Sequence, residues 1–297
     1  MCFVSGSMLI VIPNDRSQHQ STNPTLNMKE ISNQTLSQLQ HITDAACVDQ
    51  TAGIPGAVVV VVDKDGNEIF SHAAGKRGAG SNEPMTLDSV FWIASCTKMI
   101  AGIAVMQLVE KNVLNLDDAT QVESLCPYLK DVKVLQADGT LVPKKRGITL
   151  RMLLAHTAGF GYTFFNERLR KFSQPAGWDE FSGLMFDIKQ PLVHQPGEGW
   201  EYGLSIDWAG KILESATGMT LDAYCHKHIY APLGLKQISM KPNADMLRNL
   251  AFMHSRDKSG KVSKIVSEAR FQKDTEDIYL FSTTTVGPSS KASFDTR

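Results

Sequence analysis

The sequence lacks the cysteine spacing of a metal site or of a disulfide scaffold. Its five cysteines are odd in number and scattered, and no two of them form a Cys-x-x-Cys pair. This usage argues against a zinc site and predicts a reducing, cytoplasmic compartment. An excess of charge is missing as well, because 31 acidic residues balance 30 basic ones for a formal net charge of −1. Nothing in the composition therefore indicates a nucleic acid or an acidic membrane surface as a partner.

Long apolar runs and several common catalytic motifs are also missing. The apolar stretch at residues 8–12 is far too short to span a bilayer, and no positive residue precedes it, so it makes a poor signal peptide. There is no Gly-x-Ser-x-Gly elbow, no Gly-x-x-x-x-Gly-Lys loop, no His-Glu-x-x-His helix and no Gly-x-Gly-x-x-Gly turn after a strand. We therefore expect no metal, no organic cofactor and no association with a membrane.

The pattern along the chain predicts one folded region with two flanking extensions. Residues 1–30 are rich in polar amino acids and are expected to form a disordered N-terminal extension. Residues 31–283 form the predicted domain, with a mostly helical subdomain at about 115–240. Residues 284–297 consist largely of Ser, Thr, Pro and Lys and are expected to be an unstructured tail.

Local patterning predicts both helices and strands. Apolar residues recur at spacings of three and four from Ser32 to Ala46, which indicates a helix. The valine-rich run at 57–62 predicts a strand buried on both faces, and residues 64–67 supply a hairpin turn that leads to a returning strand at 68–74. Residues 125–141 show no clear period and are interpreted as an irregular connection. The fold class is therefore α+β, a mixed antiparallel sheet flanked by helices.

The candidate catalytic element is a serine followed three residues later by a lysine, at the start of an apolar helix. Positions three apart share one face of a helix, so the Ser95 hydroxyl and the Lys98 amine should point into the same space. The backbone N–H of Ser95, in the first turn, would lie near the positive end of the helix dipole, where an oxyanion is favoured. Residues 99–109 are apolar almost all round, which predicts a buried helix and disfavours the ammonium form of Lys98. The alternative for so short a motif is that Ser95 caps the helix and Lys98 is solvated.

Five segments together resemble the serine β-lactamase and penicillin-binding-protein-like family. Residues 84–98 (PMTLDSVFWIASCTK) are similar to its opening active-site motif, and residues 148–159 (ITLRMLLAHTAG) to its second signature. Three further matches follow in family order: 195–202 (QPGEGWEY), 213–218 (LESATG) and 232–235 (PLGL). The resemblance covers roughly residues 50–240 and implies the β-lactamase/transpeptidase-like fold. It also implies that Ser95 is the nucleophile, with Lys98 as the base that activates it.

The resemblance places Tyr202 at the tyrosine of the family's Tyr-x-Asn motif, where it would pass a proton to the leaving group. The alternative is an interface tyrosine with an apolar body and a polar tip. Members that hydrolyse lactams carry asparagine two residues later, whereas this chain has Leu204, which can neither donate nor accept a hydrogen bond. The form of residues 202–210 (YGLSIDWAG) instead resembles members that act on esters, namely bacterial esterases and the fungal acyltransferases that load acyl groups onto statin-like polyketides.

Several side chains near these motifs are expected to contact the substrate: Trp92, His156, Phe160, Tyr162, Leu204 and Asp207. For His156 a structural role is the stronger alternative, since no second histidine or carboxylate stands at ligand spacing. The aromatic residues that follow it, including Phe164 and Phe165, would either line an apolar acyl pocket or pack the core of the helical subdomain. The sequence does not separate these two interpretations.

The family's third motif, Lys-Thr-Gly or His-x-Gly on a late strand, does not follow Tyr202. Residues 280–283 (LFST) resemble the start of the strands that return to the sheet, after which the pattern is lost, so we expect a truncated chain with an incomplete sheet. The predicted function is serine-dependent transfer of an acyl group from a small-molecule ester or acyl-thioester, free or on a carrier protein, by an esterase or acyltransferase of secondary metabolism. The alternatives are an inactive homologue that serves as a binding module, and a hydrolase of β-lactams or peptides.

Overall fold

The computed structural model describes residues 3–4, 31–49, 53–182, 184–264 and 284–286. The predicted N-terminal extension and C-terminal tail therefore lie almost entirely outside the described residues, as does the 280–283 segment that resembles the returning strand.

The contacts divide the chain into two compact units. One unit comprises Met1–Trp92, Asn243–Gln272 and Thr285–Arg297, and the other comprises Ile93–Pro242 and Lys273–Thr284. Ser95, Lys98 and Tyr202 all belong to the second unit, so the candidate catalytic groups can be described within one unit.

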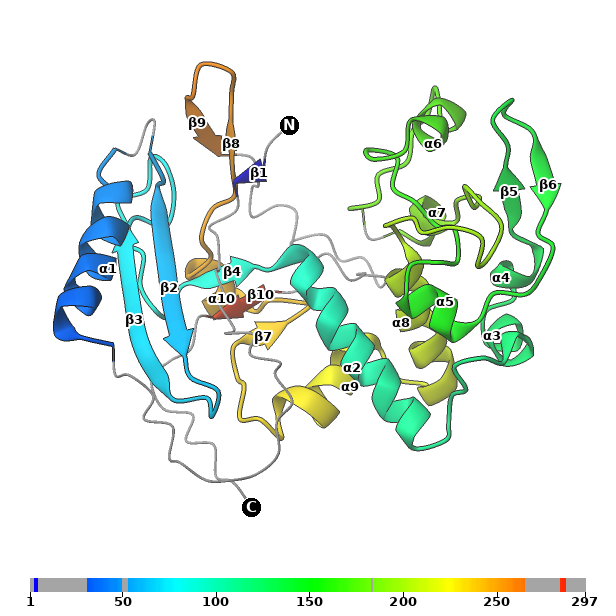
Figure 1. Cartoon of the computed structure of the whole chain (residues 1–297), viewed down its shortest axis with the longest axis horizontal. Helices are drawn as coiled ribbons and strands as arrows, with labels where there is room; N and C mark the ends of the chain where they lie inside the picture. Colours follow the sequence, from blue (N-terminus) through cyan, green and yellow to red (C-terminus); the bar gives the residue numbers. More distant parts are fainter. Residues whose placement is uncertain (1–2, 5–30, 50–52, 183, 265–283, 287–297) are drawn as a thin grey trace, which may run out of the picture. The chain divides into compact units, whose positions relative to one another are not determined.

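The first unit contains a helix and a hairpin at its N-terminal end (Figure 1). Helix α1 (Asn33–Ala46) begins after Ser32, whose side chain accepts a hydrogen bond from the backbone N–H of Thr35. Strands β2 (Gly56–Val62) and β3 (Glu68–Gly75) pair antiparallel, and α1 packs against β3. The predicted helix and both strands are confirmed. Val58–Val61 of β2 are only half-buried and Val62 is exposed, however, so the expectation of a strand buried on both faces is wrong.

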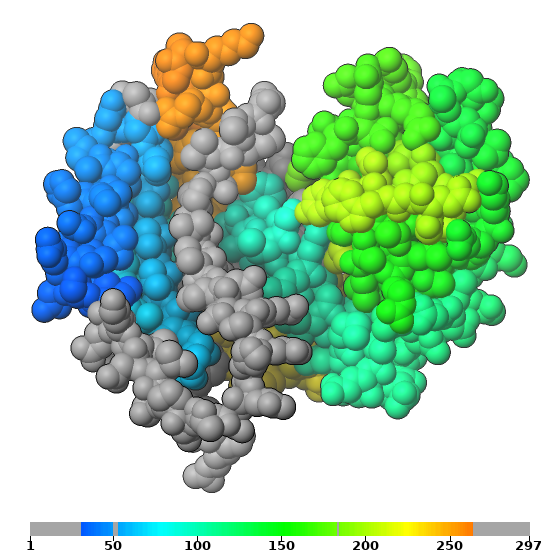
Figure 2. All heavy atoms as spheres, viewed as in Figure 1, coloured from blue at the N-terminus to red at the C-terminus, as the bar shows by residue number. Residues whose placement is uncertain are grey.

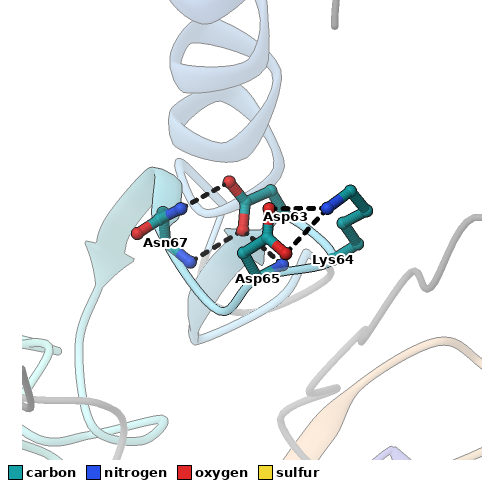
Figure 3. A network of polar contacts seen from close by, with 4 residues as sticks. All are labelled: Asp63, Lys64, Asp65 and Asn67. Atoms are coloured by element: carbon teal, nitrogen blue, oxygen red, sulfur yellow. Dashed lines mark hydrogen bonds and ion pairs between the residues drawn. The ribbon is translucent and has the colours of Figure 1, made fainter. Parts of the chain in front are cut away.

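The turn between β2 and β3 is held by one carboxylate (Figure 3). Asp63 accepts hydrogen bonds from the backbone N–H groups of Asp65 and Asn67, each at 2.8 Å, and from the Asn67 side-chain amide at 2.8 Å. These bonds hold the pKa of Asp63 below its ordinary value because they favour the ionised carboxylate. Lys64 forms an ion pair with Asp65 at 2.7 Å. The turn therefore satisfies its own backbone donors at the loop that the sequence predicts.

The rest of the first unit consists of short elements: β1 (Phe3–Val4), β4 (Val90–Trp92), α10 (Ala244–Arg248), β8 (His254–Arg256) and β9 (Val262–Lys264). Strands β1, β8 and β9 form a small antiparallel sheet in the order β1-β8-β9. Val90 packs in an apolar cluster with Met246 and Leu250, and the backbone N–H of Ala251 donates to the carbonyl of Val90. Residues far apart in the sequence therefore anchor the segment that leads into the serine motif.

The second unit is mostly helical, and α2 (Thr97–Glu110) is its longest helix (Figure 1). Helix α2 packs against α8 (Ser205–Thr217) and α9 (Leu221–Cys225). The other elements are η1 (Ala94–Cys96), α3 (Ala119–Leu125), α4 (Tyr128–Asp131), β5 (Lys133–Leu135), β6 (Leu141–Pro143), α5 (Leu150–Leu154), α6 (Glu167–Phe172), α7 (Met185–Ile188), η2 (His226–Tyr230) and β7 (Ile238–Ser239). Strand β10 (Thr284–Val286) completes the described chain. Helices with small antiparallel sheets confirm the α+β class.

Two expectations about this unit are wrong. Helix α2 is not buried all round, because its Met99, Ile103 and Met106 side chains stay exposed while the opposite face is buried. The segment expected to be irregular contains α4 and the antiparallel hairpin β5–β6. The turn of this hairpin uses the left-handed Gly139 (φ 86°) and an Asp138 carboxylate that accepts a hydrogen bond from the Thr140 backbone N–H.

Candidate active site

The serine lies on the short 3₁₀ helix η1, which runs directly into α2. The residue before Ser95, Ala94, has a φ of 44°, in the left-handed region that side chains other than glycine rarely adopt. Strain of this kind is common at active sites, where the surrounding structure fixes the backbone. Ser95 itself is exposed. The sequence predicted that Ser95 lies in the first turn of the long helix. The structure instead places it before that turn, just beyond the positive end of α2.

Lys98 brings its amine to the serine and to two tyrosine rings. Lys98 Nζ lies 3.3 Å from Ser95 Oγ, within hydrogen-bond distance. The same nitrogen lies 5.0 Å from the ring centre of Tyr202 and 5.7 Å from that of Tyr162. Both distances are within the range of cation–π attraction. The predicted face-sharing of Ser95 and Lys98 is therefore observed, and the tyrosine of the third segment lies beside the same amine.

Backbone hydrogen bonds hold the segment of Tyr202 against the end of α5. The chain leaves α5 through His156, whose φ of 57° breaks the helix, and the Glu201 backbone N–H donates to the His156 carbonyl at 3.0 Å. Gly203 lies flush against the backbone of residues 160–161, with no room for a side chain. In Figure 2 the yellow-green part of the chain that leads into α8 lies against the green segments of the same unit. The second and third family segments, residues 148–159 and 195–202, thus meet at Tyr202.

His156 packs edgewise in this site as a neutral ring. Its ring centre lies 4.8 Å from that of Tyr202 and 6.2 Å from that of Trp200. Burial and then the charge of Lys98 lower the pKa of His156 from 6.5 to about 4. Its Nδ1 atom is buried with no hydrogen-bond partner in the described part of the chain. At neutral pH this histidine is therefore an uncharged wall beside Tyr202.

Tyr162 forms the inner side of the site. Its ring centre lies 5.8 Å from that of Tyr202, and its side chain is buried. Burial raises the pKa of the Tyr162 phenol, and the nearby charge of Asp207 raises it further. The neighbouring Thr163 donates from its backbone N–H to the buried Glu180 carboxylate at 2.7 Å, which fixes this loop. Tyr162 is therefore held as a neutral phenol next to the lysine.

Two predicted substrate contacts, Leu204 and Asp207, lie in the interior at the start of α8. Leu204 is 0% exposed and Asp207 is 1% exposed. Burial raises the pKa of the Asp207 carboxyl from 3.8 to about 7, although the positive charge of Lys98 opposes that rise. Neither carboxyl oxygen has a hydrogen-bond partner among the described residues. Direct contact of these two side chains with a substrate stays a prediction.

A row of exposed and half-buried aromatic rings extends from Tyr202, and we call it the aromatic strip: Trp200, Tyr202, Phe165, Phe164 and Phe181. Neighbouring ring centres in this row are between 4.6 and 6.5 Å apart. Trp200 is 64% exposed and Phe165 is 68% exposed. Large aromatic surfaces seldom stay in water without a partner to cover them. The strip is therefore a candidate surface for an apolar part of the substrate.

The structure brings together most, but not all, of the predicted residues. Phe160 is fully buried and packs on Trp208, with ring centres 5.9 Å apart. Trp92 is half-buried at the end of β4 in the first unit. Sequence reasoning did not single out Trp200, although its place two residues before Tyr202 in the third segment was a usable signal. The role of Phe160 and Trp92 at the substrate stays a prediction.

No group of three or more His, Cys, Asp or Glu side chains in the described residues could hold a metal ion. No helix in the same part of the chain is long and apolar enough to cross a membrane.

Known proteins share both the sequence and the fold. The chain is 32% identical over 240 residues to the monacolin J acid methylbutanoyltransferase of Aspergillus terreus, covering 76% of this chain and 58% of the relative. It is 37% identical over 210 residues to the lovastatin esterase of Penicillium rubens, covering 67% and 52% respectively. The chain thus spans little more than half the length of the curated relatives it matches.

Solved structures of similar proteins also share the fold of this chain. Simvastatin synthase (LovD) from Aspergillus terreus, in its LovD6 mutant form, superposes with a TM-score of 0.73 at 29% identity, covering 89% of this chain and 66% of that one. EstCE1, a hydrolase with promiscuous acyltransferase activity, gives 0.66 at 25% identity, covering 85% and 70%. The Beta-lactamase family profile matches residues 41–283, which is most of the chain. The predicted family resemblance and fold are confirmed, and the chain belongs to the Beta-lactamase family.

Proposed function

We propose that this chain catalyses serine-dependent acyl transfer from ester or thioester substrates. The observation that carries the proposal is the 3.3 Å contact between Lys98 Nζ and Ser95 Oγ, with the Tyr202 ring beside the same amine. A nucleophile within hydrogen-bond reach of a base is the arrangement that covalent catalysis requires. The acyltransferases and esterases among the relatives support the same reaction class.

In the proposed reaction Ser95 Oγ bonds to the acyl carbon while its proton moves to Lys98 Nζ. The bond to the alcohol or thiol then breaks, and the leaving group takes up a proton through Tyr202. This leaves an acyl-enzyme on Ser95. Water or an acceptor alcohol attacks that ester, and its proton returns along the same groups, which restores the serine. The same residues therefore serve hydrolysis and transfer.

The aromatic strip indicates the chemical kind of substrate. Its exposed Trp200 and Phe165 rings offer apolar area next to Tyr202, and apolar burial contributes about 25 cal/mol per Å². We infer a small-molecule substrate with an apolar acyl or acceptor skeleton, in line with the secondary-metabolite substrates in the relatives' names. A carrier protein that presents the acyl thioester is part of the same proposal. The described cysteines Cys47, Cys96, Cys126 and Cys225 are free thiols, which supports a cytoplasmic setting.

The test removes the nucleophile and the base separately. Ser95→Ala should lower kcat/KM on a short-chain p-nitrophenyl ester by several orders of magnitude, because the covalent step is lost. Lys98→Arg keeps the positive charge but should cost nearly as much as Lys98→Ala, since a guanidinium does not deprotonate in proteins. Mass spectrometry after a serine-reactive phosphonate should find the adduct on the Ser95 peptide. Ester turnover in Ser95→Ala equal to that of the unmodified chain would refute the proposal.

A further inference from the structure

A buried carboxylate holds the loop that carries part of the aromatic strip. Glu180 is 5% exposed. One of its oxygens accepts a hydrogen bond from the Thr163 backbone N–H at 2.7 Å, and the other accepts one from the Thr163 hydroxyl at 3.0 Å. The side-chain amide of Gln190 donates to the first oxygen at 3.1 Å. These three bonds offset the cost of burying the carboxylate, and two of them fix both the backbone and the side chain of Thr163.

A ring contact lies beside these hydrogen bonds. Phe181 follows Glu180 in the chain and Phe164 follows Thr163, and the two rings stack with their centres 5.6 Å apart and their planes 21° apart. Two neighbouring residues of one segment thus hold two neighbouring residues of the other, and we call these four the clasp: Thr163, Phe164, Glu180 and Phe181. All four belong to the second unit.

One more ring joins the clasp to Tyr202. The ring centres of Phe164 and Phe165 are 4.6 Å apart, and that of Phe165 lies 6.5 Å from that of Tyr202. Phe164 is 44% exposed and Phe165 is 68% exposed, although the carboxylate that holds their loop is buried. Core packing does not require that rings left in water be fixed in this way, whereas rings fixed in advance bind an apolar ligand with a smaller loss of conformational entropy.

Resting on the proposed function, we propose that Glu180 is a positioning residue that fixes these rings as a subsite for the alcohol half of the ester. In the proposed reaction Tyr202 passes a proton to the leaving alcohol, so the oxygen of that alcohol lies at Tyr202, beside Phe165. An acceptor alcohol takes the same place during transfer. Its oxygen bonds to the acyl carbon, its proton leaves through Tyr202, and the bond to Ser95 Oγ breaks as the serine regains a proton. Glu180 touches neither the substrate nor the reacting atoms in this scheme.

The two halves of the substrate should therefore respond differently when the clasp is broken. Without the clasp, the Phe164 and Phe165 rings must be ordered by the alcohol that binds them, so an apolar alcohol should bind more weakly. Ethanol has too little apolar surface to gain much from these rings. The acyl chain extends from the carbon that Ser95 attacks and does not rest on the rings in this scheme.

The experiment uses vinyl acetate as the acyl donor, because its leaving group is small, and compares 2-cyclohexylethanol with ethanol as acceptor. In Glu180→Ala the KM for 2-cyclohexylethanol should rise about tenfold more than the KM for ethanol, with the maximal rate of transfer changed less than about threefold. The ratio of kcat/KM for hydrolysis of vinyl octanoate to that of vinyl acetate should stay within about twofold. A change in this acyl ratio with an unmoved alcohol ratio would overturn the proposal.

A conservative variant and a matched control separate positioning from loss of stability. In Glu180→Gln the amide oxygen still accepts from the Thr163 backbone and the amide nitrogen donates to the Thr163 hydroxyl, so the KM for 2-cyclohexylethanol should return to within about threefold. Glu123→Ala removes a half-buried carboxylate of the same unit, bonded to Lys144 at 2.6 Å, and should leave the alcohol ratio in place. Equal shifts in Glu123→Ala and Glu180→Ala would overturn the proposal. Thr163→Val, which loses only the hydroxyl bond, should raise the same KM about threefold and decides the matter if Glu180→Ala does not fold.

A second readout does not depend on turnover. Saturation-transfer NMR of 2-cyclohexylethanol titrated with the protein gives a Kd, which should be about tenfold weaker in Glu180→Ala and unchanged in Glu123→Ala. If no Ser95-dependent turnover is found but the Kd still weakens, the proposed function fails while the clasp stands as part of a binding site. If Ser95-dependent transfer is present and neither the KM nor the Kd moves, the inference about Glu180 fails alone.

Discussion

At the scale of single residues, a buried acid links folding to pH. The pKa of Asp207 rises from 3.8 to about 7 in the folded chain, mainly through burial. Below pH 3.8 the carboxyl is neutral in both the folded and the unfolded chain, so it has no pH-dependent effect. Between pH 3.8 and 7 the unfolded chain ionises while the folded chain stays protonated, so the free energy of unfolding falls as pH rises. Above pH 7 the full cost is present.

Asp207→Asn should therefore stabilise the fold at pH 8. The gain in the free energy of unfolding should be about 4 kcal/mol at most, from a shift of roughly three pKa units at about 1.4 kcal/mol each. At pH 4 the variant and the unmodified chain should unfold alike. Urea unfolding at the two pH values measures this, and a difference that is equal at both would contradict the assignment.

His156 changes the free energy of unfolding with pH in the opposite direction to Asp207. Its pKa of about 4 lies below the ordinary 6.5, so the unfolded chain binds a proton that the folded chain excludes. Stability from this residue is present above pH 6.5 and is lost as pH falls toward 4. Both chains in the comparison carry His156, so its contribution cancels in the difference between them.

The sequence predicted the chemistry of single residues better than their conformation. Spacing alone placed the Ser95 hydroxyl and the Lys98 amine together, because positions three apart share a helix face. The left-handed backbone at Ala94 and His156 was not predictable, since alanine rarely adopts it and histidine, although enriched there, adopts it at only a minority of positions. Asp207 was predicted only as a substrate contact, because burial and the absence of hydrogen-bond partners appear only in three dimensions.

At the scale of elements, the close contact at Gly203 holds Tyr202 in place. An added Cβ would collide with the carbonyl oxygen of Phe160 and the backbone of Gly161, none of which can move as a flexible side-chain end does. Gly203→Ala should therefore displace the segment of Tyr202, lower kcat/KM on an ester by at least about tenfold, and destabilise the fold by about 1–3 kcal/mol. Thermal unfolding and ester kinetics measure the two effects.

Gly102 is the matched control for that substitution. It lies inside α2, with ordinary helical φ and nothing within 4 Å of an added Cβ. Gly102→Ala should stabilise the fold by about 0.5–1 kcal/mol, because alanine favours a helix over glycine, and should leave ester kinetics unchanged. If Gly203→Ala behaves like Gly102→Ala, close backbone packing does not position Tyr202.

Long elements were predictable and short ones were not. The periods of α1, β2 and β3 extend over seven residues or more, enough for a helix or strand pattern to be seen. Strands β5 and β6 have three residues each, too few to show an alternation, and only the Asp138-Gly139 pair marked their turn. The sequence of α2 gave its apolar character but could not say which of its faces has a neighbour.

At the scale of the whole molecule, five residues of the candidate site belong to one of the two units. Ser95, Lys98, Tyr202, Tyr162 and Asp207 fall within Ile93–Pro242, although they come from segments more than 100 residues apart. Family membership was predictable because five short motifs occur in a fixed order, whereas none of them is specific alone. The division into units was not predictable, since residues 243–272 join the N-terminal part of the chain.

Substrate class is the property of the whole molecule that the structure makes easiest to test. Leu204 is fully buried beside Tyr202, where lactam-hydrolysing members of the family carry an asparagine, so no side-chain amide is available there to bind the amide of a lactam. A site built to hydrogen-bond a substrate discriminates strongly, while apolar fit discriminates only modestly. We therefore expect a much larger kcat/KM for a p-nitrophenyl ester than for a chromogenic cephalosporin.

Leu204→Asn should not reverse this preference. The amide would replace a leucine with no exposed surface, so it should destabilise the fold by about 2–4 kcal/mol and recover negligible cephalosporin turnover. Leu233→Asn, at a leucine that is 48% exposed in the same unit, is the control and should change neither stability nor substrate preference appreciably. Paired kcat/KM values for the two substrates, with thermal unfolding of each variant, decide the matter. A preference of the unmodified chain for the cephalosporin would show that the ester assignment is wrong. Rapid lactam turnover in Leu204→Asn would show that this one side chain, rather than the surrounding site, sets the substrate class.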